Sequence, residues 1–474
     1  MSITRTVARN TLFLSAAQGI RMLLGFVLII YIANVYGVAW QGKFSILLAF
    51  LNIFQVLASF GLPRLITREV ARDAAAGNRF FWAGLAGQGL TTLAFMVLMA
   101  GVVALMPYPA DTKQMLWLAV LALPLFTLYS VAGALLRAHE RMHYLVYAEV
   151  ASSIAQLAVA VILLSAGGSV LALAAIRIAG LSLAAVAVAA AALRLGYITR
   201  PAWDGAFTRG LLRQSTDFFG MAAFDALLQR LDVLILSVLA GEIAAGLYDA
   251  AFQFVKVLMT LVLSFTDAIY PTLSRLHVQA RERFALATGK ALSYGFILLL
   301  PVAAGTTLLA PDLIALLYRR PDYAPAAEVL AVLSWALLAY FGQILLTRVL
   351  MAGAHPHLAF QITAAMVGVG VVVLAGLSAW LGPSGAAWGL LILYSGGAFL
   401  SWRASHSYAI DFNLLCLGRP LLAAALMAAT LFFLPGLPLW AALLLGAGLY
   451  ILFALGLGVF DRGDVQVLRS LFQR

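Results

Sequence analysis

Residues 246–269 read GLYDAAFQFVKVLMTLVLSFTDAI, a long apolar run with polar side chains at regular intervals. At spacings of 4, 3, 4, 4 and 3 residues, six of them share one narrow helix face: Asp249, Gln253, Lys256, Thr260, Ser264 and Asp267. That face is about 27 Å long, close to the roughly 30 Å hydrocarbon thickness of a bilayer. A charge at the centre of a lipid-facing helix costs about 2.5–3.5 kcal/mol, so the face must meet protein or water. Interhelical hydrogen bonds would satisfy it, but its continuity favours a hydrated cavity.

The composition excludes a water-soluble fold. Of 474 residues, 64% are apolar and 10% are charged, and the mean hydropathy is +1.00. A soluble domain is about 45–50% apolar and about 25% charged, so this chain lacks the polar residues for a soluble surface. A soluble enzyme, a disordered chain and a nucleic-acid-binding protein are therefore excluded. The single cysteine, Cys416, excludes disulfide frameworks and cysteine-ligated metal sites.

The apolar runs predict an all-α polytopic membrane protein, because helices satisfy their own backbone hydrogen bonds in lipid. About 20 apolar residues cross the hydrocarbon core. We expect about fourteen spans of this kind. Their approximate limits are 11–35, 40–63, 81–106, 113–136, 144–166, 169–193, 215–240, 246–274, 291–310, 325–351, 358–381, 385–403, 417–435 and 438–460. The first run is too long for a cleavable signal peptide, and it ends in Asn34, Tyr36 and Gly37 without a small-residue cleavage pattern.

The basic residues predict the orientation. If both termini are cytoplasmic, roughly 22 of the 30 Lys and Arg residues lie in inner loops and about 4 in outer loops. This bias explains the net charge of +11 without nucleic acid. We therefore expect a multi-pass protein of the bacterial cytoplasmic (inner) membrane with cytoplasmic N- and C-termini.

An internal repeat predicts two pseudo-symmetric six-helix lobes and a C-terminal helix pair. A shift of 204 residues superimposes Gly37 on Gly241 and Gly42 on Gly246, and then also Ser45 on Asp249. Repeated bundles are the usual construction of secondary transporters. The predicted parts are an N-terminal lobe (1–193), a cytoplasmic linker (194–214), a C-terminal lobe (215–410) and a peripheral pair with a cytoplasmic tail (411–474). That pair serves packing and insertion alone, or lines a lateral groove for a lipid tail.

Other spans carry polar faces as well. The second span has Gln41, Ser45, Asn52, Gln55 and Ser59 on one face. Gln18 and Arg21 lie on one face of the first span. In the seventh span Asp225 and Asp232 lie on one side, and Arg230 points roughly 150° away. Arg177 in the sixth span is isolated, and both structural pairing and a functional role remain open for it. No motif predicts a catalytic centre, a metal site or a cofactor.

Several of these stretches resemble a known family. They are Asn-Thr-Leu from Asn10, Gly37-x4-Gly42-Lys-Phe-Ser, Phe60-Gly-Leu-Pro-Arg, Gln229-Arg-Leu-Asp232, Gly246-Leu-Tyr-Asp-Ala-Ala and Ala268-Ile-Tyr-Pro271. They resemble the bacterial polysaccharide or O-antigen flippases of the multidrug/oligosaccharidyl-lipid/polysaccharide (MOP) exporter superfamily. The chain is also similar to lipid II flippases, whose first, second and eighth spans carry cavity arginines. Asn52 and Gln55 stand where such a cation is expected, which argues against a peptidoglycan precursor.

The resemblance implies a non-enzymatic flippase that moves an isoprenoid-diphosphate-linked oligosaccharide from the cytoplasmic to the periplasmic leaflet. Two lobes would alternate access to a polar central cavity. Removing sugar hydroxyls and a diphosphate from water is costly unless polar groups replace the water. Our hypothesis assigns the diphosphate to Arg21 and Lys256, with help from Arg230. It assigns binding of the sugars to Gln18, Asn52, Gln55, Gln253 and Thr260. Four aspartates would balance the cations or carry a coupling ion, H⁺ or Na⁺: Asp225, Asp232, Asp249 and Asp267.

Three alternatives remain open at this stage. A cation-coupled multidrug exporter would share the architecture, although Arg21 and Lys256 disfavour cationic drugs. A membrane-embedded glycosyltransferase or polymerase would need acidic or metal-binding outer residues, and 311–324 offers only Asp312 and Asp322 beside two arginines. A non-transporting scaffold leaves the polar faces unexplained. For the flippase, the expected partners are the lipid-linked oligosaccharide, membrane lipids and polysaccharide-assembly proteins.

Overall fold

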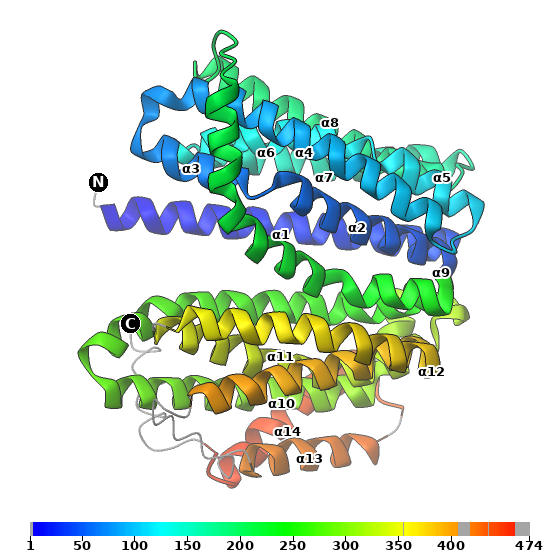
Figure 1. Ribbon diagram of the computed structural model, residues 1–474. Coiled ribbons are helices and arrows are strands. Elements are labelled where there is room, and N and C mark those ends of the chain that lie inside the picture. Colours follow the sequence, from blue (N-terminus) through cyan, green and yellow to red (C-terminus); the bar gives the residue numbers. More distant parts are fainter. Residues whose placement is uncertain (1–2, 354, 406–417, 435, 460–474) are drawn as a thin grey trace. The chain divides into compact units, whose positions relative to one another are not determined.

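The computed structural model describes residues 3–353, 355–405, 418–434 and 436–459, and the regular elements there are all helical (Figure 1). The first helices are α1 (Ile3–Tyr36), α2 (Val38–Ser59), α3 (Leu62–Arg72), η1 (Ala74–Ala76), α4 (Gly77–Leu105), α5 (Ala110–Ala119), α6 (Ala122–Ala138), α7 (Met142–Ser165) and α8 (Leu171–Arg194). The next are α9 (Gly205–Gln279), α10 (Arg281–Leu317), η2 (Pro321–Tyr323), α11 (Ala326–Ala352), α12 (Pro356–Ser405), α13 (Gly418–Phe432) and α14 (Leu439–Gly456). The prediction of an all-α membrane protein is confirmed.

In the described residues, 11 helices are long and apolar enough to cross a bilayer. Two of these, α9 and α12, are each made of two helices that meet at a kink, at Gly241 or at Gly382, where a short loop was predicted. The expected number of fourteen spans stays a prediction. In addition, α13 has only 15 residues. A single glycine can redirect a chain without ending its helical hydrogen bonding on either side, because it adopts backbone angles that other residues avoid.

The two glycines predicted as counterparts have the same unusual backbone. Gly37, before α2, has φ 85° and ψ −173°, and Gly241 in α9 has φ 82° and ψ −176°. This region of conformational space is essentially restricted to glycine. The shift of 204 residues therefore aligns two equivalent turns, each followed by a helix with a polar face.

The chain divides into two compact units, Met1–Gly246 (unit 1) and Leu247–Arg474 (unit 2). In unit 1, α8 packs against α5, α6 and α7, and α1 packs against α7 and α2. One apolar core includes Ile32, Ile46 and Leu173, and a second includes Leu65 and Leu135. In unit 2, α11 packs against α10 and α12, and α10 also contacts α13 and α14.

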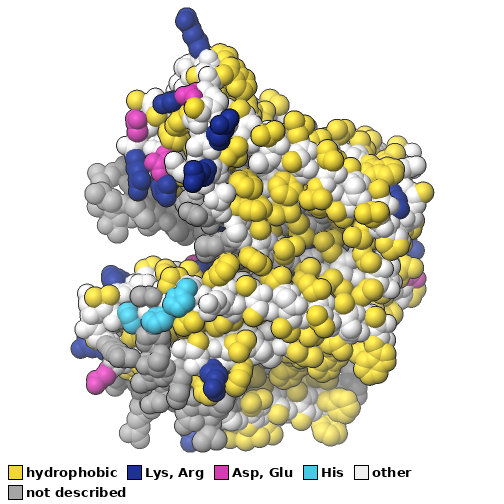
Figure 2. Space-filling view, in the orientation of Figure 1, with side chains coloured by type: hydrophobic (Ala, Val, Ile, Leu, Met, Phe, Trp, Pro, Cys, Tyr) yellow, Lys and Arg dark blue, Asp and Glu magenta, His cyan; other side chains and the backbone are white. Residues whose placement is uncertain are grey.

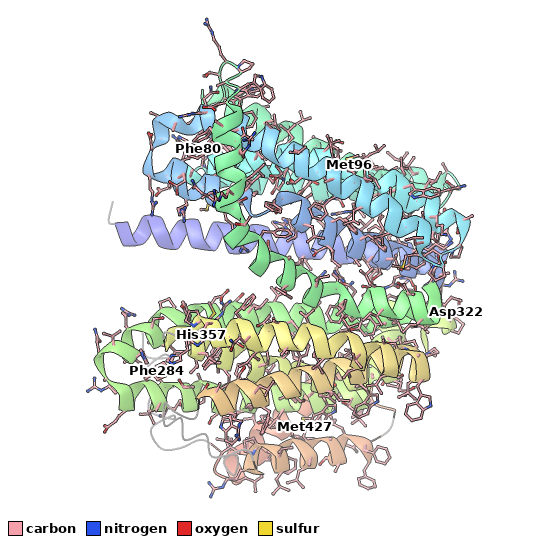
Figure 3. The ribbon with its side chains drawn as sticks, viewed as in Figure 1. Phe80, Met96, Phe284, Asp322, His357 and Met427 are labelled. Atoms are coloured by element: carbon pink, nitrogen blue, oxygen red, sulfur yellow. The ribbon has the colours of Figure 1, made fainter. Side chains whose placement is uncertain are left out.

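The surface agrees with a membrane environment. Figure 2 shows hydrophobic side chains over most of the visible surface of each unit. Large apolar residues are widely exposed, including Val97 at 74% and Val372 at 72%. In unit 1, Lys and Arg side chains gather at the end that includes Phe80 (Figures 2 and 3). The exposed arginines of unit 1 include Arg64, Arg68, Arg72, Arg200 and Arg209.

The predicted linker is folded onto unit 1. Asn78 donates to the carbonyl of Arg200 at 3.0 Å and accepts from the amide of Thr199 at 2.8 Å. Arg79 pairs with Asp204 at 2.6 Å. The Phe207 amide donates to Asp204 at 2.9 Å. This amide, and then Arg79, hold the pKa of Asp204 below its usual range.

Candidate functional site

The eighth predicted span forms the second part of α9, and its polar face changes from buried to exposed along its length. Asp249 and Gln253 are buried at 3% and 5% exposure. Lys256 and Thr260 are half-buried, and Ser264 and Asp267 are exposed. The Gln253 amide donates to both Asp249 oxygens at 3.1 Å. Asp249 and Gln253 therefore meet on one side of α9, and a hydrated cavity along this face stays a prediction.

The hydroxyls of this face bond to their own helix. Thr260 donates to the Lys256 carbonyl at 2.9 Å, and Ser264 donates to the Thr260 carbonyl at 3.0 Å. Serine and threonine often make such i−4 bonds inside helices. These two hydroxyls consequently offer a ligand mainly their acceptor lone pairs, whereas Lys256 provides the positive charge of the face.

The exposed end of the face has a cation that the sequence analysis missed. Arg348 of α11 donates to Asp267 at 2.7 Å. Its guanidinium carbon lies 6.0 Å from the centroid of the Tyr270 ring. The sequence contains a signal that could have identified Arg348, because this arginine lies inside the apolar run 325–351 and a charge in a membrane span needs a partner or water.

In unit 1 the predicted cation Arg21 of α1 lies in an ion cluster. It donates to one oxygen of Glu149 in α7, and the Tyr129 hydroxyl of α6 donates to the other. The Arg21 and Glu149 side chains are 36% and 28% exposed. Both partners come from helices other than α1, more than a hundred residues away in sequence, so helical periodicity could not identify them.

The other predicted residues of unit 1 have differing surroundings. Gln18 and Asn52 are exposed, and Gln55 is half-buried. Asp232 is buried at 4%, and its carboxylate accepts from the Val233 amide at 2.8 Å. Arg230 is half-buried.

The side chain of Asp225 lies outside the described residues. That the polar faces of α2 and α9 converge on one cavity stays a prediction.

A second ion cluster lies at the Gly37 end of unit 1. Lys43, near the start of the expected span 40–63, is inside α2 and only 8% exposed. Its ammonium group pairs with Asp111 of α5 and lies 3.5 Å from Glu242 of α9. The Thr112 hydroxyl donates to Glu242. This arrangement joins three helices around one buried cation.

The same end holds a close crossing of α2 and α9. A Cβ on Gly42 would overlap the Glu242 carbonyl and lie 3.0 Å from the Gly246 nitrogen. A Cβ on Gly246 would overlap the Val38 carbonyl and lie 3.0 Å from the Gly42 nitrogen. The two repeat glycines therefore contact each other reciprocally. Nearby, Tyr108 shares a 2.7 Å hydrogen bond with Ser237, and burial raises the pKa of Tyr108 to about 12.

Arg177 of α8 has a neutral partner. It donates to the Gln156 side chain of α7 at 2.6 Å, and Gln156 donates to Ser152 at 3.1 Å. No ion pair with Arg177 is present among the described side chains. Similarly, in the part of the chain that the structure describes, no three His, Cys, Asp or Glu residues gather as a metal site.

Unit 2 also contains a lateral apolar groove. It has a volume of about 640 Å³ and lies between α10, α13 and α14. Its lining includes Tyr294, Pro301, Met427, Gly446 and Tyr450, and Figure 3 labels Met427 on α13. The Tyr450 hydroxyl donates to the Ile297 carbonyl at 2.7 Å, so this polar group of the lining is satisfied. Such a groove fits a hydrocarbon chain.

Comparison with known proteins gives both a family and a fold. A family model described as "Polysaccharide biosynthesis protein" matches residues 7–277. A protein of Escherichia coli (strain K12) named "Putative O-antigen transporter" is 22% identical over 297 residues, which are 61% of this chain and 70% of that protein.

Several solved structures share the fold. The inward closed conformation of the lipid II flippase MurJ has a TM-score of 0.81 at 14% identity, covering 96% of this chain and 100% of that one. An inward-facing multidrug resistance MATE family transporter of the MOP superfamily has a TM-score of 0.66 at 14% identity, covering 83% and 96%. The chain is thus a multi-pass membrane protein with a MurJ- and MATE-like fold, and it belongs to the polysaccharide biosynthesis protein family.

Proposed function

We propose that the protein is a flippase for a lipid-linked oligosaccharide, an isoprenoid diphosphate that carries a glycan. It moves this substrate from the cytoplasmic to the periplasmic leaflet of the inner membrane by alternating access, with both termini cytoplasmic. The observation that carries the proposal is the polar face of α9, which runs from buried Asp249 to exposed Asp267 in a polysaccharide biosynthesis protein. A glycan needs such polar groups at bilayer depth, because a dehydrated hydroxyl without a partner costs a few kcal/mol.

The residues divide by chemistry. Arg21 and Lys256 hold the diphosphate with Arg230, because guanidinium and ammonium groups donate charge-assisted hydrogen bonds to phosphate oxygens. The amide and hydroxyl groups of the polar faces bind the sugars: Gln18, Asn52, Gln55, Gln253 and Thr260. Asp225, Asp232, Asp249 and Asp267 balance the cations or carry a coupling H⁺ or Na⁺. The protein has no catalytic step of its own.

The isoprenoid tail occupies the groove between α10, α13 and α14. The groove volume of about 640 Å³ lies within the roughly 300–1,000 Å³ typical of ligand pockets. Its apolar lining gives a hydrocarbon chain an environment similar to lipid, so the tail loses little on entering. Membrane lipids and polysaccharide-assembly proteins are the remaining partners.

The test is complementation of a strain that lacks the gene. Lys256→Ala should abolish surface glycan at normal protein level, and Lys256→Arg should retain part of it. The matched control is Lys113→Ala, because Lys113 is a half-buried lysine outside the polar face of α9 whose ammonium group donates to the Ala104 carbonyl at 3.0 Å. Wild-type glycan output from Lys256→Ala would remove that residue from the mechanism.

A cation-coupled exporter of amphiphilic drugs is the second candidate. The similarity to a MATE family transporter and the buried carboxylate of Asp249 favour it. Deletion of the gene separates the two candidates. Lipid-linked glycan that accumulates in the deletion strain supports the flippase, whereas drug sensitivity with normal surface glycan supports the exporter.

A further inference from the structure

Two donors bond to one carboxylate in unit 1, and a second guanidinium group belongs to the same region. Arg21 of α1 bonds to one Glu149 oxygen, and Tyr129 of α6 bonds to the other. Arg137, two turns further along α6, directs its side chain back toward Tyr129: its Nη2 lies 3.4 Å from the Ser130 carbonyl. Its charge acts on both Tyr129 and Glu149. The cluster thus contains two guanidinium groups and one carboxylate.

This arrangement has the form of an anion site that is filled by the protein itself. Two guanidinium groups and a hydroxyl are the donors that proteins use for phosphate groups, and guanidinium binds carboxylate and phosphate through similar bidentate geometry. One carboxylate leaves an excess of one positive charge. A diphosphate, with more negative charge and more acceptor oxygens, satisfies these donors more completely.

The site is accessible and not part of a sealed core. The Arg21 side chain is 36% exposed and that of Glu149 is 28% exposed, and Arg137 and Tyr129 are half-buried. Partly exposed ion pairs are weak, so an external anion can compete with Glu149 for Arg21. A fully buried pair would resist such an exchange.

We infer that Glu149 is an internal competitor for the diphosphate of the substrate. The diphosphate displaces Glu149 from Arg21 and Tyr129 and gains Arg137 as a further donor, and the return of Glu149 to Arg21 assists release. This inference rests on the proposed function and adds three residues to it: Glu149 and Arg137 set the affinity for the headgroup, and Tyr129 positions it.

The test measures the binding of farnesyl diphosphate to the purified full-length chain in uncharged nanodiscs by titration calorimetry. Glu149→Gln keeps the shape and removes the competing charge, so its affinity should rise at least about tenfold, equivalent to about 1.4 kcal/mol. Glu149→Asp retains a carboxylate and should stay near the wild type. Arg21→Gln should weaken binding about tenfold.

The matched control is Glu69→Gln, since Glu69 of α3 also pairs with two arginines, Arg68 and Arg72, but lies outside the cluster. Its affinity should not change. Inorganic pyrophosphate and farnesol serve as separate probes, so that binding of the headgroup is measured apart from binding of the tail. The gain in Glu149→Gln should appear with pyrophosphate and not with farnesol.

The direction of the effect makes the test decisive, because a misfolded variant loses affinity and cannot gain it. If the wild type binds farnesyl diphosphate but Glu149→Gln binds it equally or more weakly, the competitor role is wrong and the flippase proposal stands. A gain seen with farnesol would also contradict the inference. If neither the wild type nor Glu149→Gln binds farnesyl diphosphate, the proposed function fails.

Discussion

The crossing of α2 and α9 in unit 1 predicts that alanine at Gly42 is destabilising. An alanine Cβ there would overlap the backbone carbonyl of Glu242 and approach the Gly246 nitrogen to 3.0 Å. A backbone carbonyl cannot rotate away as the end of a flexible side chain can. The helices must therefore separate.

The cost has two parts. Overpacking of a well-packed site costs about 1–3 kcal/mol, and a backbone clash places Gly42→Ala at the upper end of that range. Separation of the helices also lengthens the Lys43–Glu242 contact beyond its present 3.5 Å. We therefore expect Gly42→Ala to lower the free energy of unfolding by about 3 kcal/mol or more. Gly246→Ala, which overlaps the Val38 carbonyl, should also be destabilising.

The assay is the thermal unfolding of the purified protein in one detergent, followed by the fluorescence of a size-exclusion peak. Gly89→Ala is the matched control, because Gly89 lies inside α4 and a Cβ there would meet nothing within 4 Å. Alanine favours the helix over glycine by about 0.8–1.0 kcal/mol, so the control should melt at the wild-type temperature or above. Equal melting temperatures for Gly42→Ala and Gly89→Ala would refute the close crossing.

Three further predictions concern charged groups. Lys43→Met leaves the buried Glu242 without its cation and should cost about 3 kcal/mol in the same unfolding assay, with part of the loss recovered when Glu242→Gln is added. Asp204 has a lowered pKa in the folded protein, so its contribution to stability is complete above the usual carboxyl pKa of about 4 and is lost as the pH falls through the lowered value. The backbone amides of residues 197–207 should therefore lose protection against hydrogen exchange only below about pH 4 in the wild type. In Asp204→Ala they should be less protected than in the wild type at every pH above that value. Arg348→Met should change the free energy of unfolding by less than about 1 kcal/mol, because its partner Asp267 is largely exposed. A larger loss would show that the pair is more deeply buried than its 26% and 61% exposure indicates.

The sequence by itself determined the features that depend on neighbours along the chain. The spacing from Asp249 to Asp267 placed six polar groups on one face because the α-helix repeats every 3.6 residues. Apolar run lengths located the spans, and the shift of 204 residues identified Gly37 and Gly241 as equivalent turns, whose φ angles of 85° and 82° agree. The family resemblance also came from short local motifs, and the match over residues 7–277 confirms it.

Only the tertiary structure decided which of these groups meet. Helical periodicity gives the direction of a side chain but not the helix that it faces, so it could not pair Arg21 with Glu149 or place Lys43 between Asp111 and Glu242. The shift of 204 residues aligned Gly42 with Gly246, but their mutual contact results from the packing of α2 against α9. Likewise, nothing local distinguishes Asp249, buried at 3%, from exposed Asp267 on the same face. Burial and pairing depend on the neighbouring helices, and those contacts form between residues that lie far apart in the sequence.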